Sequence, residues 1–183
     1  EIREVRKKLS DTSHQSLFQA EASEQIIKGL SQIEYLLPRY HCVVTNPPYM
    51  GGKGMDQRLK DFVKKYYPDS KSDLFAAFME KCFELLIQKG YMGMINQQSW
   101  MFLSSYEKLR MKLLEEKTIV TMAHLGARAF DTIGGEVVST TTFVMENFYR
   151  PEYKGGYIRL VDENSESKKS ALLRKVISCQ RQN

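Results

Sequence analysis

The chain has 183 residues, of which 42% are hydrophobic and 27% charged, with a formal net charge of +5 and a pI of about 9.0. This composition is typical of a globular protein and excludes collagen, a disordered acidic tail and a small disulfide scaffold. No run of about 18 apolar residues is present, which excludes a membrane-spanning helix, and the mild basic excess permits a nucleic-acid partner without proving one.

The first 45 residues predict one helix and one strand. Residues 1–19 are polar and weakly periodic, and we treat them as a polar lead-in. Apolar residues then recur at helical spacing over Ala20–Leu37, and Pro38 ends this amphipathic pattern. His41–Thr45 is short, apolar and β-branched without alternation, which is typical of a strand buried in a parallel sheet. The next residues, Asn-Pro-Pro-Tyr at 46–49, cannot continue a strand because proline has no N–H group.

A second helix and strand are predicted after the tetrad. Asp73–Gln88 has an apolar helical face, on which Leu86 falls. Ser72 or Asp73 is placed to cap its start, and Gly90 is placed to end it. Tyr91–Ile95 follows as a short strand.

The remaining elements continue the alternation. Ser104 and Glu107 fit a capping box that opens a helix through about Glu116. The later segments are, in order, a strand at Ile119–Leu125, a turn at Gly134-Gly135, a strand at Val137–Met145 and a strand at Tyr157–Val161. After these comes a Ser/Lys/Glu-rich stretch that we interpret as a linker or the start of another module. The order predicts an α/β fold whose sheet is largely parallel with an antiparallel last strand.

Cysteines and histidines give no metal site. No CxxC pair occurs among Cys42, Cys82 and Cys179. We therefore predict that they are small buried hydrophobic side chains, kept reduced in the cytosol. His14, His41 and His124 share no ligand spacing with them, and we predict no metal.

The tetrad at the end of the first strand is the feature that carries chemistry, because ligands of open α/β sheets bind there. The Asn46 side-chain carbonyl and the Pro47 backbone carbonyl, fixed by the stiff pair with Pro48, can accept both hydrogens of an amino group. These two hydrogen bonds draw the amino nitrogen toward sp³ geometry and free its lone pair to attack a methyl group on sulfonium. Tyr49 can stack on a base lifted out of a duplex. The plainer alternative is a turn with a buried tyrosine.

The tetrad resembles the fourth motif, [DNS]-P-P-[YFW], of S-adenosylmethionine-dependent amino-methyltransferases. The runs VVTNPPYMGG (43–52), SDLFAAFMEKCFELL (72–86), GYMGMINQQSW (90–100) and GEVVSTTTFV (135–144) together look like the adenine methyltransferases of phage-exclusion (BREX) systems, and are similar to type IIG restriction-modification enzymes. The resemblance covers about residues 30–150 and implies a Rossmann-like methyltransferase sheet.

The resemblance also implies roles for residues that match the family's motifs. Asn46 and Pro47 would bind the target amine beside the cofactor, and Tyr49 would stack on one face of the flipped base. Phe78 would lie against the cofactor adenine, and Phe130 would stack on the base's other face. Core packing is the open alternative for both phenylalanines.

One family feature is missing from the sequence. The glycine-rich first motif, which binds the cofactor's methionine part, has no counterpart in residues 1–45, where Gly29 stands within the predicted helix. The chain also starts at Glu1 rather than Met. We therefore expect a piece of a longer protein: residues 1–150 as the second half of a methyltransferase core, with strands in the order 4-5-7-6 and a bare edge at His41–Thr45, and residues 151–183 as an edge strand plus linker toward a target-recognition module.

A basic segment follows the tetrad. Lys53 stands among the glycines of Gly51–Gly54, and four further lysines and arginines follow by residue 65. We predict that Lys53 contacts DNA phosphate, whereas a solvated helix face is the favoured interpretation for the lysines past Lys60.

The expected function is site-specific adenine-N6 methylation of double-stranded DNA with S-adenosylmethionine, in the bacterial cytoplasm, with other subunits of a phage-defence system as candidate partners. Two alternatives stay open: an amino-methyltransferase acting on ribosomal RNA or a protein glutamine, and an inactive core that serves as a DNA-binding or assembly platform. This stretch alone is expected to be inactive.

Overall fold

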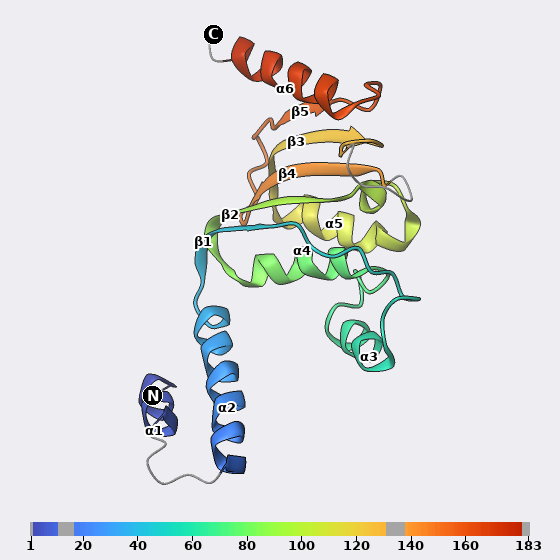
Figure 1. Cartoon of the computed structure of the whole chain (residues 1–183). Helices are drawn as coiled ribbons and strands as arrows, with labels where there is room; N and C mark the ends of the chain where they lie inside the picture. The colour runs from blue at the N-terminus through green and yellow to red at the C-terminus, as the bar shows by residue number, and fades with distance from the viewer. Residues whose placement is uncertain (1, 11–16, 131–137, 181–183) are drawn as a thin grey trace. The chain divides into compact units, whose positions relative to one another are not determined.

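The computed structural model describes residues 2–10, 17–130 and 138–180, and the chain falls into two compact units, Glu1–Arg39 and Tyr40–Asn183 (Figure 1). The first unit contains α1 (Ile2–Ser10) and α2 (Leu17–Leu36), joined by an ion pair of 2.8 Å between Arg6 and Glu34. The predicted helix at Ala20–Leu37 is confirmed as α2. The polar lead-in holds a further helix, α1, that its weak periodicity did not indicate.

The second unit is built on a five-stranded sheet. Its strands are β1 (Tyr40–Thr45), β2 (Leu86–Gln97), β3 (Thr118–Gly126), β4 (Thr140–Glu146) and β5 (Gly156–Arg159), in the spatial order β1-β2-β4-β3-β5. Strand β1 pairs with β2, and β3 pairs with β5, in parallel. Strand β4 pairs antiparallel with both of its neighbours, β2 and β3, and is therefore the one strand of this sheet that runs against the others. The predicted α/β sheet, its antiparallel strand and the bare edge at β1 are confirmed. The prediction that β1 is a buried strand is wrong, since none of its residues is fully buried and Val44 is 76% exposed.

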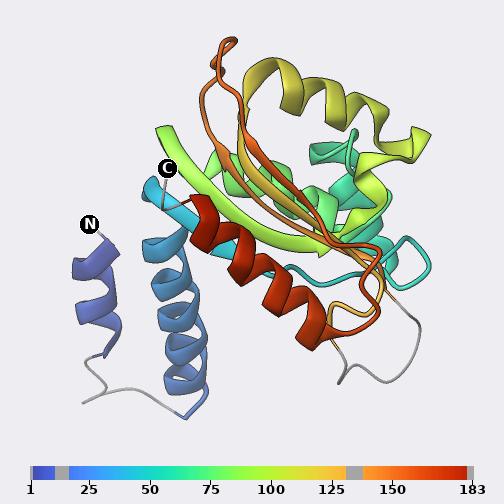
Figure 2. The same cartoon turned by 90° about the horizontal axis from the view of Figure 1, so that it is seen from above.

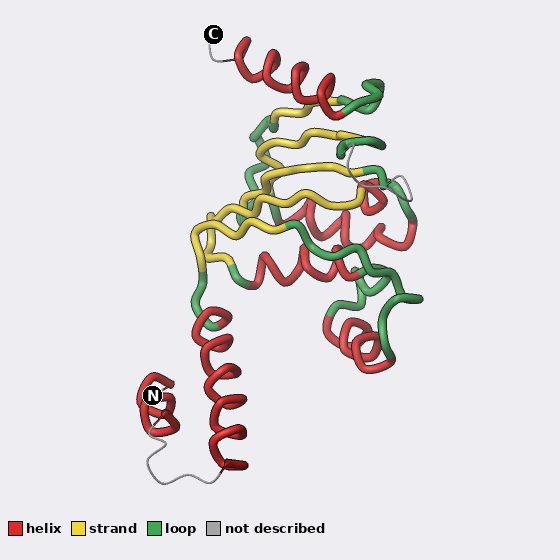
Figure 3. Tube along the Cα trace, viewed as in Figure 1, coloured by secondary structure: helices red, strands yellow, loops and turns green. Residues whose placement is uncertain are grey.

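The helices of this unit are α3 (Gln57–Tyr66), α4 (Leu74–Glu84), α5 (Glu107–Glu116) and α6 (Glu166–Gln180). Figure 2 shows α5 and α6 on opposite sides of the sheet, and α4 on the same side as α5. Two short 3₁₀ turns, η1 (Gln98–Met101) and η2 (Ser104–Tyr106), lead from β2 into α5. A loop carries the chain from β1 to α3 (Figure 3). No helix within the described ranges is long and apolar enough to span a membrane.

The core lies between the sheet and the pair α4 and α5. Its fully buried side chains include Phe75, Met79, Met92, Leu109, Phe143 and Met145. In β2 the buried residues alternate, so Met92 and Met94 face α4 while Gly93 and Ile95 belong to the other face. Each such apolar side chain contributes about 1.5–3 kcal/mol by leaving water, which fixes β2 firmly beneath the helices.

Two helix boundaries differ from the sequence prediction. α4 ends at Glu84 rather than Gln88, because Leu86 already pairs with Tyr40 as the start of β2. Gly90 therefore lies inside a strand instead of ending a helix, where a Cβ would come within 3.1 Å of the His41 carbonyl oxygen. Tertiary pairing here overrides a helical pattern that extends through the segment.

Two other predictions are corrected by the structure, and a third concerns residues that the structure does not describe. The capping box is wrong, since Tyr106 precedes α5 without any side-chain cap hydrogen bond. Of the two alternatives for the Ser/Lys/Glu-rich stretch, the linker is wrong, since residues 166–180 form α6, whose buried Lys169 donates to the carbonyl oxygens of Leu125 and Leu160 at 2.6 and 2.7 Å. The turn at 134–135 falls outside the described residues.

Candidate active site

The tetrad leaves the sheet at the carboxyl end of β1. Because β1, β2 and β3 run the same way, their carboxyl ends share this edge, which is where α/β proteins bind ligands. Pro47 is buried and Asn46 is exposed. Within the described part of the chain no hydrogen bond engages the Asn46 carboxamide. That carboxamide is therefore open to a ligand rather than saturated by its own scaffold.

Tyr49 is held on one side and open on the other. Its ring meets the ring of Phe75 edge-on, with centroids 6.1 Å apart and planes at 84°, and it remains 37% exposed. Burial, followed by the nearby Asp73 carboxylate, raises the pKa of Tyr49 above its ordinary value. A neutral, anchored and partly exposed phenol ring is suited to stacking on a planar ligand, and it is not the buried tyrosine of the plainer alternative.

Asp73 fixes the segment that follows the tetrad. Its Oδ1 accepts from the backbone N–H groups of Met50 at 2.9 Å and Phe75 at 3.3 Å. The Leu74 N–H in turn donates to the Met50 carbonyl at 3.0 Å, and Gly51 and Asp73 form a bridge. The sequence predicted Ser72 or Asp73 as the N-cap of this helix, and the structure shows Asp73 in that position. Its second role, as an anchor for the chain next to Tyr49, was missed because it depends on a pairing across 23 residues.

A depression of about 480 Å³ adjoins Asn46 on the sheet. It is lined by Val44, Thr45, Asn46, Gly93, Met94, Ile95, Thr142, Phe143 and Val144. Apart from Asn46 the lining is largely apolar, because β2 presents Gly93 and Ile95 on this side. The site thus combines one open carboxamide with an apolar floor.

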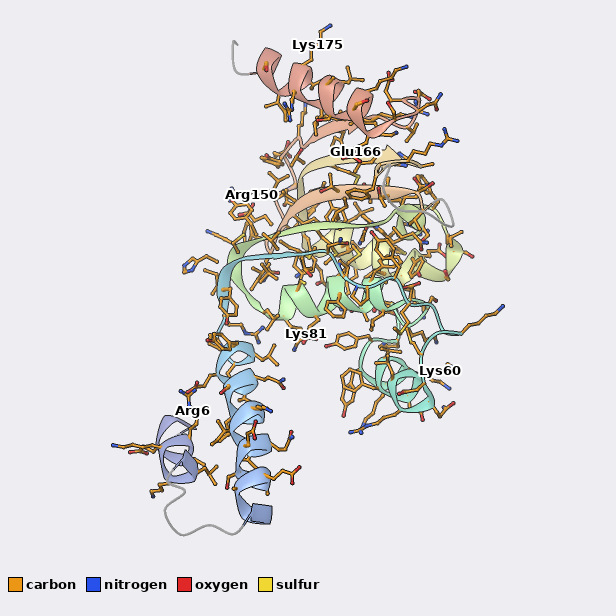
Figure 4. The ribbon with its side chains drawn as sticks, viewed as in Figure 1. Arg6, Lys60, Lys81, Arg150, Glu166 and Lys175 are labelled. Carbon is orange, nitrogen blue, oxygen red and sulfur yellow. The ribbon has the colours of Figure 1, made fainter. Side chains whose placement is uncertain are left out.

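Phe78, the residue expected to meet the cofactor adenine, lies on α4. It is half-buried, packs against the core and lines an apolar pocket of about 210 Å³ between α3 and α4, together with Leu59, Phe62, Val63, Tyr67, Leu74, Ala77 and Lys81. Figure 4 shows the labelled Lys60 on α3 and Lys81 on α4. The geometry gives Phe78 both a packing role and a face toward a pocket. The described residues fit a cofactor in part only, since residues 1–45 hold a single glycine and no glycine-rich loop.

Phe130 and Lys53 have different positions. Phe130 is 39% exposed and follows the carboxyl end of β3, beyond Gly126 and Arg128, whose φ angles are positive. It shares the edge with the tetrad, but among the described aromatic rings no contact joins it to Tyr49. Lys53 is exposed on the turn closed by the Gly54 N–H and the Gly51 carbonyl at 2.8 Å, and it forms no ion pair within the described ranges.

Sequence reasoning missed the loop that follows β2. This segment, Gln98–Leu103, leaves the same edge of the sheet from the strand next to β1. It carries an exposed Phe102 and a buried Trp100. Its first three residues end the family-like run GYMGMINQQSW, but no signal in the sequence marks Phe102, because the support of this ring comes from residues on α5 and β3.

A family model supplies the assignment. The Eco57I restriction-modification methylase model matches residues 2–130. The chain belongs to the Eco57I restriction-modification methylase family. Two relatives of this chain have names that state an enzymatic activity. It is 56% identical over 158 residues to the adenine-specific methyltransferase BrxX of Escherichia coli O9:H4 (strain HS), and 52% identical over 134 residues to the adenine-specific methyltransferase PglX of Lacticaseibacillus casei (strain Zhang).

These matches cover 86% and 73% of the methylase chain but 13% and 11% of the relatives. Solved structures support the fold. A Listeria monocytogenes protein assigned to class I S-adenosylmethionine-dependent methyltransferases matches 76% of this chain and 42% of its own, with TM-score 0.54 and 12% identity. The Type ISP restriction-modification enzyme LlaGI, in complex with a DNA substrate mimic, matches 82% of this chain and 17% of its own, with TM-score 0.59 and 17% identity. The Eco57I-family sheet is therefore of the methyltransferase kind.

Proposed function

We propose that this chain forms the target-binding half of the active site of a site-specific DNA adenine-N6 methyltransferase that acts in phage defence. The observation that carries the proposal is the exposed, unengaged Asn46 carboxamide beside the buried Pro47 and the anchored Tyr49 ring, at the carboxyl edge of the sheet. The names of the two relatives, both adenine-specific methyltransferases, support adenine as the target.

The chemistry follows from the acceptors at this edge. Asn46 Oδ1 and the Pro47 carbonyl oxygen accept the two hydrogens of the adenine amino group and orient its lone pair. S-adenosylmethionine, when bound, supplies an electrophilic methyl group on sulfonium. The amino nitrogen gains the N–C bond as the S–C bond breaks, and the nitrogen then loses one proton to solvent. Tyr49 holds the extrahelical base by stacking, which replaces interactions of about 1–3 kcal/mol lost from the duplex.

Three supporting roles belong to the same proposal. Phe78 contacts the cofactor adenine through its pocket-facing side, Phe130 stacks on the target base, and Lys53 contacts phosphate. Replacing Phe78 with leucine keeps most of the core volume and removes the ring, so S-adenosylmethionine affinity of the complete protein should fall about tenfold with little loss of stability. Isothermal calorimetry and thermal unfolding measure the two effects. Unchanged affinity would assign Phe78 to packing alone.

The decisive experiment compares Asn46→Ala with Asn164→Ala, which removes an exposed carboxamide elsewhere. In the complete protein, Asn46→Ala should lower methyl transfer to unmethylated duplex DNA by about a hundredfold or more and leave DNA binding intact, whereas Asn164→Ala should change neither. Mass spectrometry of 6-methyladenine gives the rate. The proposal fails if Asn46→Ala methylates DNA normally, or if wild-type protein methylates ribosomal RNA or a glutamine peptide instead of DNA.

Double-stranded DNA is the partner this proposal requires, with other defence-system subunits as further candidates, and the cytoplasm is where bacterial DNA would be met. The competing inactive-platform function predicts DNA binding without S-adenosylmethionine binding by the complete protein, which the same calorimetry tests.

A further inference from the structure

The loop Gln98–Leu103 after β2 is rigidly braced. Trp100 is 4% exposed, donates from Nε1 to the buried Asn96 Oδ1 at 3.1 Å, and packs edge-on against Phe143 with centroids 5.3 Å apart. From α5, Arg110 donates to the carbonyl oxygens of Trp100 at 2.9 Å and Leu103 at 2.5 Å. The loop conformation is therefore set by contacts from three elements rather than by its own sequence.

At the tip of this braced loop, Phe102 is 60% exposed. One side of its ring leans on His124 of β3, with centroids 5.8 Å apart and planes at 40°. His124 is itself held, since its Nε2 lies 2.5 Å from Gln98 Oε1. Burial, followed by the positive charges of Arg159 and Lys169, lowers the pKa of His124, so the imidazole is neutral at pH 7. The exposed face of Phe102 is thus a positioned aromatic surface with an uncharged support.

Several polar side chains lie beside the ring. A pocket of about 280 Å³ beside it is lined by Gln97, Gln98, Ser99, Phe102, Leu103, Val138 and Ser139. Gln97 Oε1 accepts from Ser99 Oγ at 2.9 Å, which leaves the Gln97 amide N–H groups as donors without a hydrogen-bond partner in the described ranges. An aromatic ring beside carboxamides and hydroxyls suits a nucleobase, which needs a stacking face and donors or acceptors at its edge.

The position of the loop matches the proposed reaction. β1 and β2 are adjacent and parallel, with Thr45 paired to Met94, so the tetrad and the loop leave neighbouring strands at the same edge. Phe102 itself rests on His124 of β3, which in the order β1-β2-β4-β3 is three strand spacings of about 4.8 Å from β1. A DNA strand that delivers an adenine to Asn46 and runs along this edge would bring a nearby nucleotide to this loop.

We propose that Phe102 stacks on an unpaired nucleobase next to the methylated adenine, with Gln97 donating to the edge of that base. This inference rests on the proposed function and adds a DNA contact to the same site. The loop is pre-organised, so the stacking energy is not spent on ordering the protein.

The test uses the complete protein with Phe102→Ala, Phe102→Tyr and Tyr149→Ala, the last removing an exposed ring at the opposite edge of the sheet. The KM for unmethylated plasmid DNA should rise about tenfold for Phe102→Ala, stay within about twofold for Phe102→Tyr and be unchanged for Tyr149→Ala, while kcat changes less than about threefold. A single-stranded oligonucleotide carrying 2-aminopurine should show fluorescence quenching on binding that Phe102→Ala reduces and Phe102→Tyr retains.

Two results would overturn the inference. One is a Phe102→Ala variant with the same KM and quenching as Tyr149→Ala. The other is a clear fall in the melting temperature of the DNA-free Phe102→Ala protein, which would show that protein, not DNA, covers the ring. Asn46→Ala in parallel separates the two proposals: if it abolishes methylation while Phe102→Ala does nothing, only the Phe102 inference fails.

Discussion

The Asp73 carboxylate accepts a hydrogen bond from the backbone N–H of Met50 at 2.9 Å, so the residue that starts α4 also holds the chain directly after Tyr49. The same Oδ1 caps the helix through the Phe75 N–H, and the Phe75 ring supports Tyr49. One carboxylate therefore links the core helix to the tetrad. The position of the Tyr49 ring depends on this carboxylate.

Asp73→Ala should destabilise the fold by about 1–2 kcal/mol, because it removes both the cap and the loop anchor. Asp73→Asn keeps an acceptor oxygen and is an equally good N-cap, so it should stay within about 0.5 kcal/mol. Urea unfolding measures both. Methyl transfer by the complete protein should fall in the alanine variant and be largely kept by asparagine. Equal loss in both variants would show that charge, not anchoring, matters.

Lys53→Ala should reduce the salt dependence of DNA binding. Loss of one phosphate contact lowers the slope of log K against log salt by about 0.9 and weakens binding to all sequences alike. Lys154→Ala removes an exposed lysine on the β4–β5 connection and serves as the matched control. Fluorescence anisotropy at several salt concentrations gives the slopes, and identical slopes for both variants would exclude a phosphate contact at Lys53.

Cys42 and Cys82 should differ in reactivity. Cys82 is buried as predicted, and burial raises the pKa of its thiol to about 11. The prediction that Cys42 is buried is wrong, because Cys42 is exposed on the edge strand β1. At pH 8 a thiol reagent should therefore modify Cys42 within minutes and Cys82 only after denaturant is added, because the thiolate is the reactive form. Mass spectrometry of a Cys179→Ser background locates the label. Rapid labelling of Cys82 in the native protein would mean that the α4 core opens readily.

The Glu146–Arg150 pair should make stability sensitive to acid. Arg150, labelled in Figure 4, donates to the buried Glu146 carboxylate at 2.6 and 2.7 Å, and these bonds lower the pKa of Glu146. A lowered native pKa means that the pair's contribution is present above the ordinary carboxyl pKa near 4.5 and is lost as pH falls through the native value. Glu146→Gln should therefore show a smaller drop in melting temperature between pH 7 and pH 3 than wild type. A drop as large as in wild type would contradict this role.

The sequence predicted those parts of the fold whose signals are local. His41–Thr45 and Ile119–Leu125 were recognisable because β-branched apolar runs form strands in most contexts, and the tetrad placed the candidate site at a strand end. The end of α4 was not predictable, since Leu86 fits a helical face and joins β2 through pairing with Tyr40. α6 was missed because its Ser/Lys/Glu composition resembles a linker, and its docking depends on the distant contacts of Lys169. Phe102 likewise gains its setting from Arg110 and His124, which lie elsewhere in the chain.

Strand β1 bears the tetrad and also forms one outer margin of the sheet, with Val44 76% exposed. Along that margin, amide and carbonyl groups of the backbone point outward and can recruit an extra strand from any neighbour. A preparation of residues 40–180 alone would therefore be expected to associate through β1 and to place its tetrad within a contact between copies. Light scattering of such a preparation would therefore report whether the free margin of β1 drives association.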